Sequence, residues 1–302
     1  MSGTTVLIVN YNGERWIERC LDSVPVSRQV EVILVDNGST DGSLKRVRVG
    51  HPGVRVLELG ENFGFGAANN RGAELASGER LLLLNPDAWI DPGALYALGV
   101  ALDRAPRVAA VAPLLRNAED RAEFSWYPEC GVLGEAIQRW RNGRTGRWAR
   151  GPREALLRVI GPGWLTAACL LVRREAFRQV GGFDERFFLY FEDVDLCRRL
   201  TRAGWKLAKE ERAGAVHVGS VGLRDEHRNG GPGRAAVEYR VSQLLYYRKH
   251  RPSWEVALLR RRLARRFCGP DASPRLREGV QAALQRDREE SIEGVGADRG
   301  LW

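Results

Sequence analysis

The chain has 302 residues, 44% of them hydrophobic, which suffices for one large domain or for one domain with appended segments. Five cysteines without C-x-x-C spacing argue against a zinc site, and no signal-peptide pattern or membrane-length apolar run is present, so we expect a cytoplasmic protein with reduced thiols. The net charge of +9 excludes no function by itself but favours an anionic partner, whether nucleic acid, nucleotide phosphate or an acidic membrane.

Short apolar runs alternate with segments of helical spacing through the first third of the chain. The runs are rich in valine, isoleucine and leucine, and the connections between elements are short, which is typical of buried parallel strands. This alternation predicts an α/β fold with a Rossmann-like, doubly wound and mostly parallel sheet. The predicted strands are residues 5–9, 30–35, 54–59 and 81–84, and the predicted helices are residues 14–24, residues 65–75 and a short one from about residue 43.

The strand at residues 81–84 carries the first candidate ligand groups. Its four leucines run into Asn85 and Pro86, and a proline cannot donate to a sheet ladder, so the strand ends there. Asp87 therefore lies at the carboxyl edge of the sheet, where a carboxylate suits a divalent cation that carries phosphates. His217, on a short apolar strand, is a second candidate ligand, for a borderline cation such as Mn²⁺. The alternatives are that Asp87 caps a turn and that His217 is structural.

The rest of the chain is less regular. Residues 117–162 place Trp126, Tyr127, Trp140 and Trp148 among many arginines and glycines, and we expect an irregular insertion near the mouth of the site. Residues 225–234 are polar and glycine-rich, which predicts a loop without fixed structure. Helices are predicted at residues 95–102, 174–180, 192–203, 237–250, 254–267 and 274–292, and strands at residues 108–114, 205–208 and 215–218; order is expected to return after the insertion at residues 164–172.

Two further segments of the first half offer nucleotide-binding groups. Asp36 ends the second strand, and a buried carboxylate there would accept the N3–H of uracil or thymine; the alternative is a turn-forming aspartate without a ligand. Residues 62–70 contain G-x-G-x-x-N, close to the dinucleotide fingerprint, with Asp87 about where a ribose-binding acid would lie, so a nicotinamide-dependent enzyme is one alternative. Against it, Asn69 replaces the third glycine, the motif follows the third strand instead of the first, and the acid comes after a proline.

An acidic cluster opens the predicted helix at residues 192–203. Glu192, Asp193 and Asp195 would be stabilised there by capping and by the helix dipole, without any ligand. However, residues 187–191 just before them are apolar and aromatic, and desolvation raises a carboxylate's pKa towards that of a working base. An acid–base role is therefore the functional interpretation of this cluster.

The predicted helix at residues 254–267 interleaves five arginines with apolar side chains. A basic amphipathic helix of this kind is typical of proteins that lie on anionic membranes. The alternative is a solvated surface helix whose arginines pair with the acidic last helix, where Asp287, Glu289 and Glu290 cluster.

Taken in order, these motifs resemble a known family. They are N-Y-N-G, V-D-N-G-S-T-D-G-S, N-F-G-F-G-A-A-N-N, L-L-N-P-D, W-L-T-A-A-C-L-L-V-R-R, G-G-F-D-E-R-F-F-L-Y-F-E-D-V-D-L-C-R-R and a late H-V-G-S. The set is similar to the family 2 inverting glycosyltransferases of GT-A fold, with closest likeness to rhamnosyltransferases, and it spans about residues 5–251. The resemblance implies a GT-A domain over residues 1–251 and a basic and charged helical C-terminal extension over residues 252–302.

The resemblance also implies a role for each candidate residue. Asp193 would be the catalytic base with Glu192 beside it, and Asp87 and His217 would hold a Mn²⁺ or Mg²⁺ ion on the diphosphate. Asn85 stands where many members have an aspartate, a form common in rhamnosyltransferase-like members. Nucleotide binding is assigned to Asn10, Tyr11, Asn12, Asp36, Gly38, Asn62, Gly64, Asn69, Asn70 and Asn85, and acceptor or sugar binding to Trp164, Thr166 and Asp195.

The implied activity is inverting transfer of a sugar, rhamnose among the candidates, from a UDP-sugar or dTDP-sugar to a hydroxyl of a glycan or lipid-linked acceptor in cell-envelope polysaccharide synthesis. A peripheral contact with the inner face of an anionic membrane would follow. The rival from another class is a non-catalytic protein that binds nucleic acid through the arginines and aromatic residues at 117–162. We expect no nucleic-acid partner, because the acidic cluster would repel phosphates and no nucleic-acid-binding motif is present.

Overall fold

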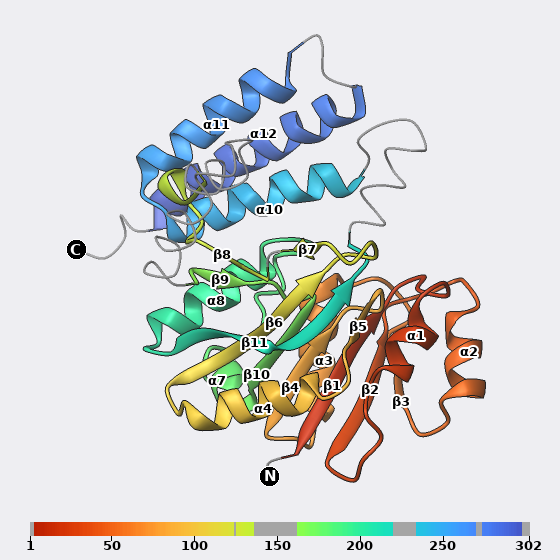
Figure 1. Cartoon of the computed structure of the whole chain (residues 1–302). Coiled ribbons are helices and arrows are strands. Elements are labelled where there is room, and N and C mark those ends of the chain that lie inside the picture. The colour runs from red at the N-terminus through yellow and green to blue at the C-terminus, as the bar shows by residue number, and fades with distance from the viewer. Residues whose placement is uncertain (1–2, 124, 136–161, 220–233, 270–273, 298–302) are drawn as a thin grey trace. The chain divides into compact units, whose positions relative to one another are not determined.

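The structure is a computed structural model that describes residues 3–123, 125–135, 162–219, 234–269 and 274–297 (Figure 1). Trp140, Trp148 and most of the expected loop at residues 225–234 lie outside these ranges. The chain divides into two compact units, one of Met1–Arg186 and Glu192–Gly219, the other of Phe187–Phe191 and Ser220–Trp302.

The first unit is built on one large mixed sheet. Within the described residues its strands run in the order β3-β2-β1-β4-β10-β6-β11-β5, and β7 pairs with β6. A separate two-stranded sheet joins β8 to β9. The strands are β1 (Thr4–Asn10), β2 (Val30–Asp36), β3 (Arg55–Glu58), β4 (Arg80–Leu84), β5 (Ala88–Ile90), β6 (Val108–Arg116), β7 (Ala122–Glu123), β8 (Trp126–Tyr127), β9 (Trp164–Leu165), β10 (Cys169–Arg173) and β11 (Lys206–His217).

Strand pairing is parallel in the first half of the sheet and mixed in the second. β1 pairs in parallel with both β2 and β4, β2 pairs in parallel with β3, and β6 pairs in parallel with β11. β10 lies antiparallel between β4 and β6, and β5 lies antiparallel to β11. The predicted strands at 205–208 and 215–218 form one strand, β11, with irregular register between Glu210 and Gly214.

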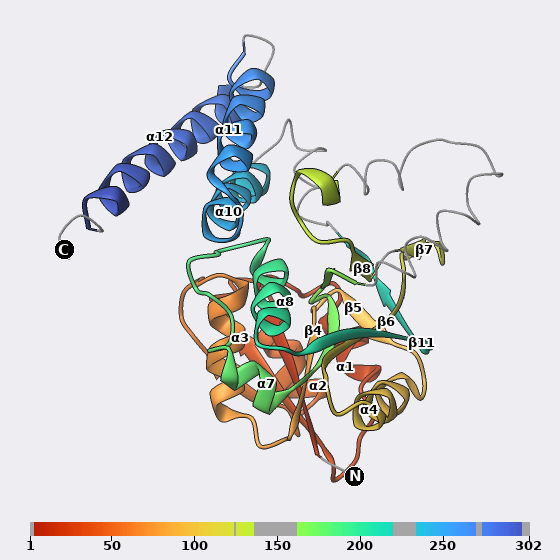
Figure 2. The same ribbon diagram turned by 90° about the vertical axis from the view of Figure 1, so that its left-hand side faces the viewer.

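Helices cover both faces of this sheet, as Figure 2 shows for α3, α7 and α8 on one side and α4 on the other. Residues 81–84 are at most 1% exposed, and alternate leucines of β4 enter two separate core clusters. Burial of each leucine contributes about 2 kcal/mol, so this strand is central to the fold. The face of the sheet with Leu82 and Leu84 carries α1 (Ile17–Asp22), α2 (Ser43–Gly50) and α4 (Ala94–Arg104). The face with Leu81 and Leu83 carries α3 (Phe65–Leu75), α7 (Arg174–Gln179) and α8 (Glu192–Arg202).

Within the described residues, the second unit consists of three helices and the short segment at residues 187–191. α10 (Arg234–His250), α11 (Ser253–Phe267) and α12 (Pro274–Ala297) pack on one another, and residues 187–191 join them through ring contacts such as Phe191 with Tyr246. The boundary that we expected between residues 251 and 252 falls between α10 and α11. α10 lies in one compact unit with α11 and α12, and the domain boundary itself stays a prediction. No helix in the described part of the chain combines the length and the apolar character that crossing a bilayer requires.

Candidate active site

Three parallel strands end side by side at one edge of the sheet. In the register of β1 with its neighbours, Asn10 pairs with Asp36 and Ile8 pairs with Leu84. The residues that follow Leu84, Asn85 first among them, therefore emerge at the same edge as Asn10 and Asp36. This is the edge at which open α/β sheets bind ligands.

Asp36 is buried within a polar network at this edge. It is 3% exposed, and Asn10, fully buried, donates from Nδ2 to Asp36 Oδ1 at 3.0 Å. The backbone N–H of Ser39 donates to Asp36 Oδ2 at 3.0 Å, and Asn10 Nδ2 also lies 2.9 Å from Ser43 Oγ. These bonds fix the carboxylate in one orientation at the strand end. Its predicted contact with a nucleobase stays a prediction, and Ser39 and Ser43 are members of the network that sequence reasoning missed.

The loops after β2 and β3 are joined by Asn37, which sequence reasoning also missed. Its Nδ2 donates to Asn62 Oδ1 at 2.9 Å, and Asn62 Oδ1 in turn accepts the Gly64 N–H at 2.9 Å. Gly64 has φ of 89° and Gly38 has φ of 81°, backbone that favours glycine, and a Cβ on Gly38 would lie 2.8 Å from Glu61 Cα. These two predicted nucleotide-binding glycines, one in each loop, are therefore explained by backbone conformation and by the close approach of the two loops.

The turn after β1 presents the other predicted nucleotide residues. Tyr11 is 51% exposed, and Asn12 has a left-handed φ of 53°. Asn12 Oδ1 accepts the Thr40 N–H at 2.8 Å, which couples this turn to the loop after β2. An exposed aromatic ring over a rigid polar loop is suited to stacking on a base.

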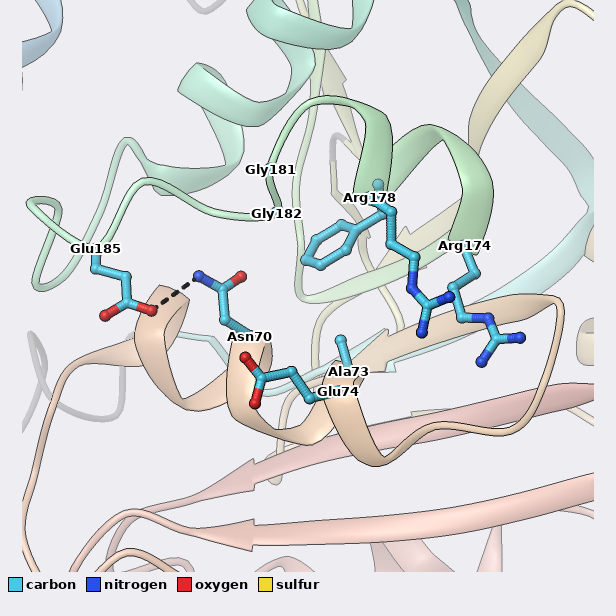
Figure 3. Close-up of a pocket in the computed structure, with 9 residues that line it drawn as sticks. Asn70, Ala73, Glu74, Arg174, Arg178, Gly181, Gly182 and Glu185 are labelled. Carbon is cyan, nitrogen blue, oxygen red and sulfur yellow. Dashed lines mark hydrogen bonds between the residues drawn. The ribbon is translucent and has the colours of Figure 1, made fainter.

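Helix α3 holds two more of the predicted nucleotide residues in contacts with protein. Asn69 Nδ2 donates to Phe65 O within its own helix at 3.0 Å. Asn70 donates to Phe183 O at 2.9 Å, and it donates to Glu185 Oε1 at 3.1 Å, as Figure 3 shows. Asn70 also lines a cavity of about 420 Å³ between α3 and α7, whose rim includes Arg174 and Arg178. Both amides thus have structural partners, and their roles in nucleotide binding stay predictions.

Asn85, Asp87 and His217 converge at the end of β4. His217 Nε2 lies 3.4 Å from Asp87 Oδ1 and 3.3 Å from Asn85 Nδ2, and the side chains of Asp87 and His217 are 19% and 18% exposed. The antiparallel pairing of β5 with β11 causes this, since it sets His217 opposite Ala88.

A carboxylate, an imidazole and an amide around one point suit a borderline divalent cation, so these residues fit the expected metal. The described residues contain no group of three or more histidine, cysteine, aspartate or glutamate side chains placed to hold a metal ion. Any cation here would therefore rely on two such side chains, the amide of Asn85 and ligands from the substrate.

Glu192 and Asp193 begin α8, where Glu192 is buried and Asp193 is partly buried. Burial raises the pKa of Asp193 to about 6, while backbone N–H groups, that of Ala167 first among them, oppose the shift. Burial and the adjacent charge of Asp193 raise the pKa of Glu192 well above its usual range. Glu192 is 7% exposed and its Oε2 has no hydrogen-bond partner in the described part of the chain. A carboxyl group with a pKa near 6 is suited to general-base catalysis near neutral pH.

The turn between β9 and β10 connects Asp193 with the cluster at Asn85. The Ala167 N–H donates to Asp193 Oδ2 at 3.2 Å, and the next residue, Ala168, accepts the Asn85 N–H at its carbonyl oxygen at 3.0 Å. Thr166 also bonds to Asp193. The predicted base and the backbone of Asn85, two residues before the predicted metal ligand Asp87, are thus held by consecutive residues of one turn.

The last two predicted site residues have clear structural contacts. Trp164 stacks on Tyr127 with ring centroids 4.2 Å apart, in the small β8–β9 sheet that precedes the turn. Asp195 is fully buried and forms an ion pair with Arg199 at 2.6 Å. Asp195 therefore has a structural partner within α8, and the predicted acceptor role of both residues stays a prediction.

Comparisons with known proteins agree with this arrangement. A family model described as glycosyl transferase family 2 matches residues 5–181. The chain is 40% identical to the N-acetylglucosaminyl-diphospho-decaprenol L-rhamnosyltransferase of Mycobacterium tuberculosis strain H37Rv over 233 residues, which cover 70% of this chain and 75% of that protein. It is 25% identical to rhamnosyltransferase WbbL of Escherichia coli K12 over 219 residues, which cover 70% of this chain and 82% of that protein.

Solved structures show the same fold. The mannosyltransferase PcManGT of Pyrobaculum calidifontis, solved in complex with GDP-Man and Mn²⁺, superposes with a TM-score of 0.58 at 19% sequence identity. The superposition covers 100% of this chain and 81% of that chain.

Proposed function

Because this chain belongs to glycosyl transferase family 2, we propose that it transfers rhamnose from a nucleoside-diphosphate-sugar to a hydroxyl of a lipid-linked glycan acceptor, with inversion at the anomeric carbon. The chain is a glycosyltransferase with the expected mostly parallel α/β fold of GT-A type. The two rival interpretations, a nucleic-acid-binding protein and a nicotinamide-dependent enzyme, are not favoured. The name of the mycobacterial relative supplies the sugar and the class of acceptor.

The observation that carries the mechanism is the turn at residues 166–168. It binds the Asp193 carboxylate through the Ala167 N–H and the Asn85 backbone through the Ala168 carbonyl. A single displacement at a sugar needs a base and a group that binds the leaving diphosphate, held in a fixed geometry. This turn contacts the proposed base on one side and the proposed diphosphate-binding cluster on the other.

Asp193 accepts the proton of the acceptor hydroxyl as its oxygen attacks the anomeric carbon. The bond from that carbon to the diphosphate oxygen breaks at the same time, so the configuration inverts. Glu192 is poorly suited to be a covalent nucleophile, because its raised pKa favours the protonated form. Of these two neighbouring carboxyl groups, Asp193 is then the one suited to accept a proton, which supports a single displacement.

The nucleotide is proposed to bind where the loops after β1, β2 and β3 meet. Asp36 would accept a hydrogen bond from a uracil or thymine base, and Tyr11 would stack on it. Asp87 and His217, with the Asn85 amide, would hold Mn²⁺ or Mg²⁺. When bound, that cation would neutralise charge on the departing diphosphate.

The experiment is a donor panel of dTDP-rhamnose and UDP-hexoses with an N-acetylglucosaminyl-diphospho-polyprenol acceptor, and the anomeric configuration of the product read by NMR. Asp193→Asn should bind the donor normally in calorimetry and lose on the order of 10²–10⁴ in rate, since it removes only the base. Asp120→Asn is the matched control, because Asp120 is exposed and its φ of 58° suits asparagine. Turnover of Asp193→Asn at the wild-type rate would place the base at Glu192 or Asp195.

A further inference from the structure

Helix α11 presents an exposed face that combines apolar and basic side chains. Trp254 is 60% exposed and Leu258 is 45% exposed, and Arg261 and Arg265 are exposed as well. These four positions are i, i+4, i+7 and i+11, which project from one side of a helix over about 16 Å. We call these four residues the α11 face.

The opposite side of α11 packs within its own unit. Val256, Leu259 and Leu263 are at most 7% exposed, and Arg260 donates to Asp287 of α12. The acidic residue of α11, Glu255, is 3% exposed and paired with Arg251 at 2.6 Å. The helix therefore contributes no acidic group to the α11 face. The arginine that pairs with α12 is Arg260, which is not part of that face.

We propose that the α11 face docks on the surface of an anionic lipid bilayer. An indole and a leucine side chain bury in the interfacial region of a bilayer, while guanidinium groups on the same stripe meet the phosphates of anionic lipids. This proposal rests on the proposed function, because a lipid-linked acceptor would be confined to such a surface.

Two other partners fit the α11 face less well. In a dimer formed through this face about a two-fold axis, Arg261 and Arg265 of one copy would approach the same two arginines of the other copy. The face has no acidic group to offset this repulsion between like charges. Single-stranded nucleic acid is bound through successive stacked bases, and the face offers one aromatic ring. A bilayer needs neither a complementary acidic group nor several rings.

The test is flotation of the full-length chain with phosphatidylcholine vesicles and with vesicles that also contain phosphatidylglycerol. Wild type should float with the anionic vesicles at about 0.15 M salt and be released at about 1 M, where screening acts within about 3 Å. Arg261→Gln/Arg265→Gln should lower partitioning roughly 25-fold, about fivefold for each arginine. Trp254→Ser/Leu258→Ser should weaken flotation at about 0.15 M salt although both arginines remain.

Arg28→Gln/Arg178→Gln is the matched control, because it removes the same charge from exposed positions of the first unit and should float like wild type. Equal loss in this control, wild-type flotation of both α11 variants, or equal binding to neutral and anionic vesicles would each overturn the proposal. So would a dimer in light scattering that Trp254→Ser/Leu258→Ser dissolves. Flotation requires neither donor nor acceptor, so its result is independent of transfer to a soluble acceptor analogue, which tests the proposed function.

Discussion

At Asp193, burial determines what the carboxyl group can do. The side chain lies at the start of α8, and loss of water raises its pKa to about 6 although backbone N–H groups bond to the carboxylate. A base with this pKa is ionised at neutral pH and still binds a proton strongly enough to assist attack by a hydroxyl. An ordinary exposed aspartate, with a pKa of about 3.9, would be a much weaker base.

The first prediction concerns the pH dependence of this group. Asp193 must be ionised to act, so kcat/KM should fall about tenfold per unit as the pH drops below about 6. The effect on stability has the opposite sign. Because the folded-state pKa is raised, the free energy of unfolding should decrease as pH rises from about 4 to about 6. The pKa of Glu192 is raised as well, and this group interacts with Asp193, so the pH profile reports the two carboxyl groups together.

Initial rates and thermal unfolding across this pH range measure both effects. Asp193→Asn should unfold at a higher temperature than wild type at pH about 7, and this advantage should shrink at pH about 4, where wild type is protonated too. A rate that stays constant from pH about 7 down to about 4.5 would contradict a buried base at this position.

The second prediction concerns His217, which lies 3.4 Å from Asp87. If both hold a cation, His217→Ala should weaken Mn²⁺-dependent binding of a nucleoside diphosphate at least tenfold and leave binding of the nucleoside unchanged. His51→Ala is the control, because His51 lies at the end of α2 and contacts Asp22. Titration calorimetry with and without Mn²⁺ gives the difference directly, and an identical metal effect in His217→Ala would remove this residue from the site.

At the scale of elements, Gly66 explains part of a sequence motif. A Cβ on Gly66 would lie 3.0 Å from Phe183 Cβ and 3.7 Å from Glu192 Cβ, so the glycine lets α3 approach the segment that leads into α8. The motif that resembles a dinucleotide fingerprint thus serves, at this position, the close packing of a helix. No cofactor is needed to account for the glycine.

The third prediction follows from this packing. Gly66→Ala should displace Phe183 and the start of α8, lower the free energy of unfolding by about 1 kcal/mol after the gain in helix propensity, and lower kcat more than donor affinity. Gly53→Ala is the control, since nothing lies within 4 Å of its Cβ position. An unchanged kcat in a folded Gly66→Ala variant would show that the start of α8 tolerates the shift.

Local pattern predicted the elements better than their pairing. The helix predicted at residues 65–75 matches α3, and the four leucines are the last four residues of β4, because periodicity and a following proline are local signals. The antiparallel direction of β10 could not be predicted, since it depends on where the chain returns after residues 117–162. His217 faces Asp87 through the β5–β11 pairing, which no short-range pattern contains. The Asn70 amide bonds across 113 residues to Phe183, a contact of the same kind.

At the scale of the whole molecule, the packing of α10 determines how the chain divides. A Cβ on Gly279 of α12 would lie 2.6 Å from a methyl group of Val237 in α10, so these two helices are in close contact. Asp287 of α12 is 5% exposed and pairs with Arg248 of α10 and Arg260 of α11, which ties all three helices together. A domain that ends at residue 251, as expected from the resemblance, would keep α10 without these partners.

The last prediction tests that boundary with a chain that ends after residue 251. Loss of α11 and α12 would uncover the side of α10 that faces Gly279 and leave Arg248 without the carboxylate of Asp287, so the truncated chain should bind a hydrophobic dye and unfold at a lower temperature. Asp287→Asn is the graded control: it keeps the helices but weakens the pairing of two partly buried arginines, at a cost of about 1–3 kcal/mol in the free energy of unfolding. Its melting temperature should lie between those of wild type and the truncated chain. A truncated chain that melts like wild type and binds no dye would instead place a domain boundary between α10 and α11.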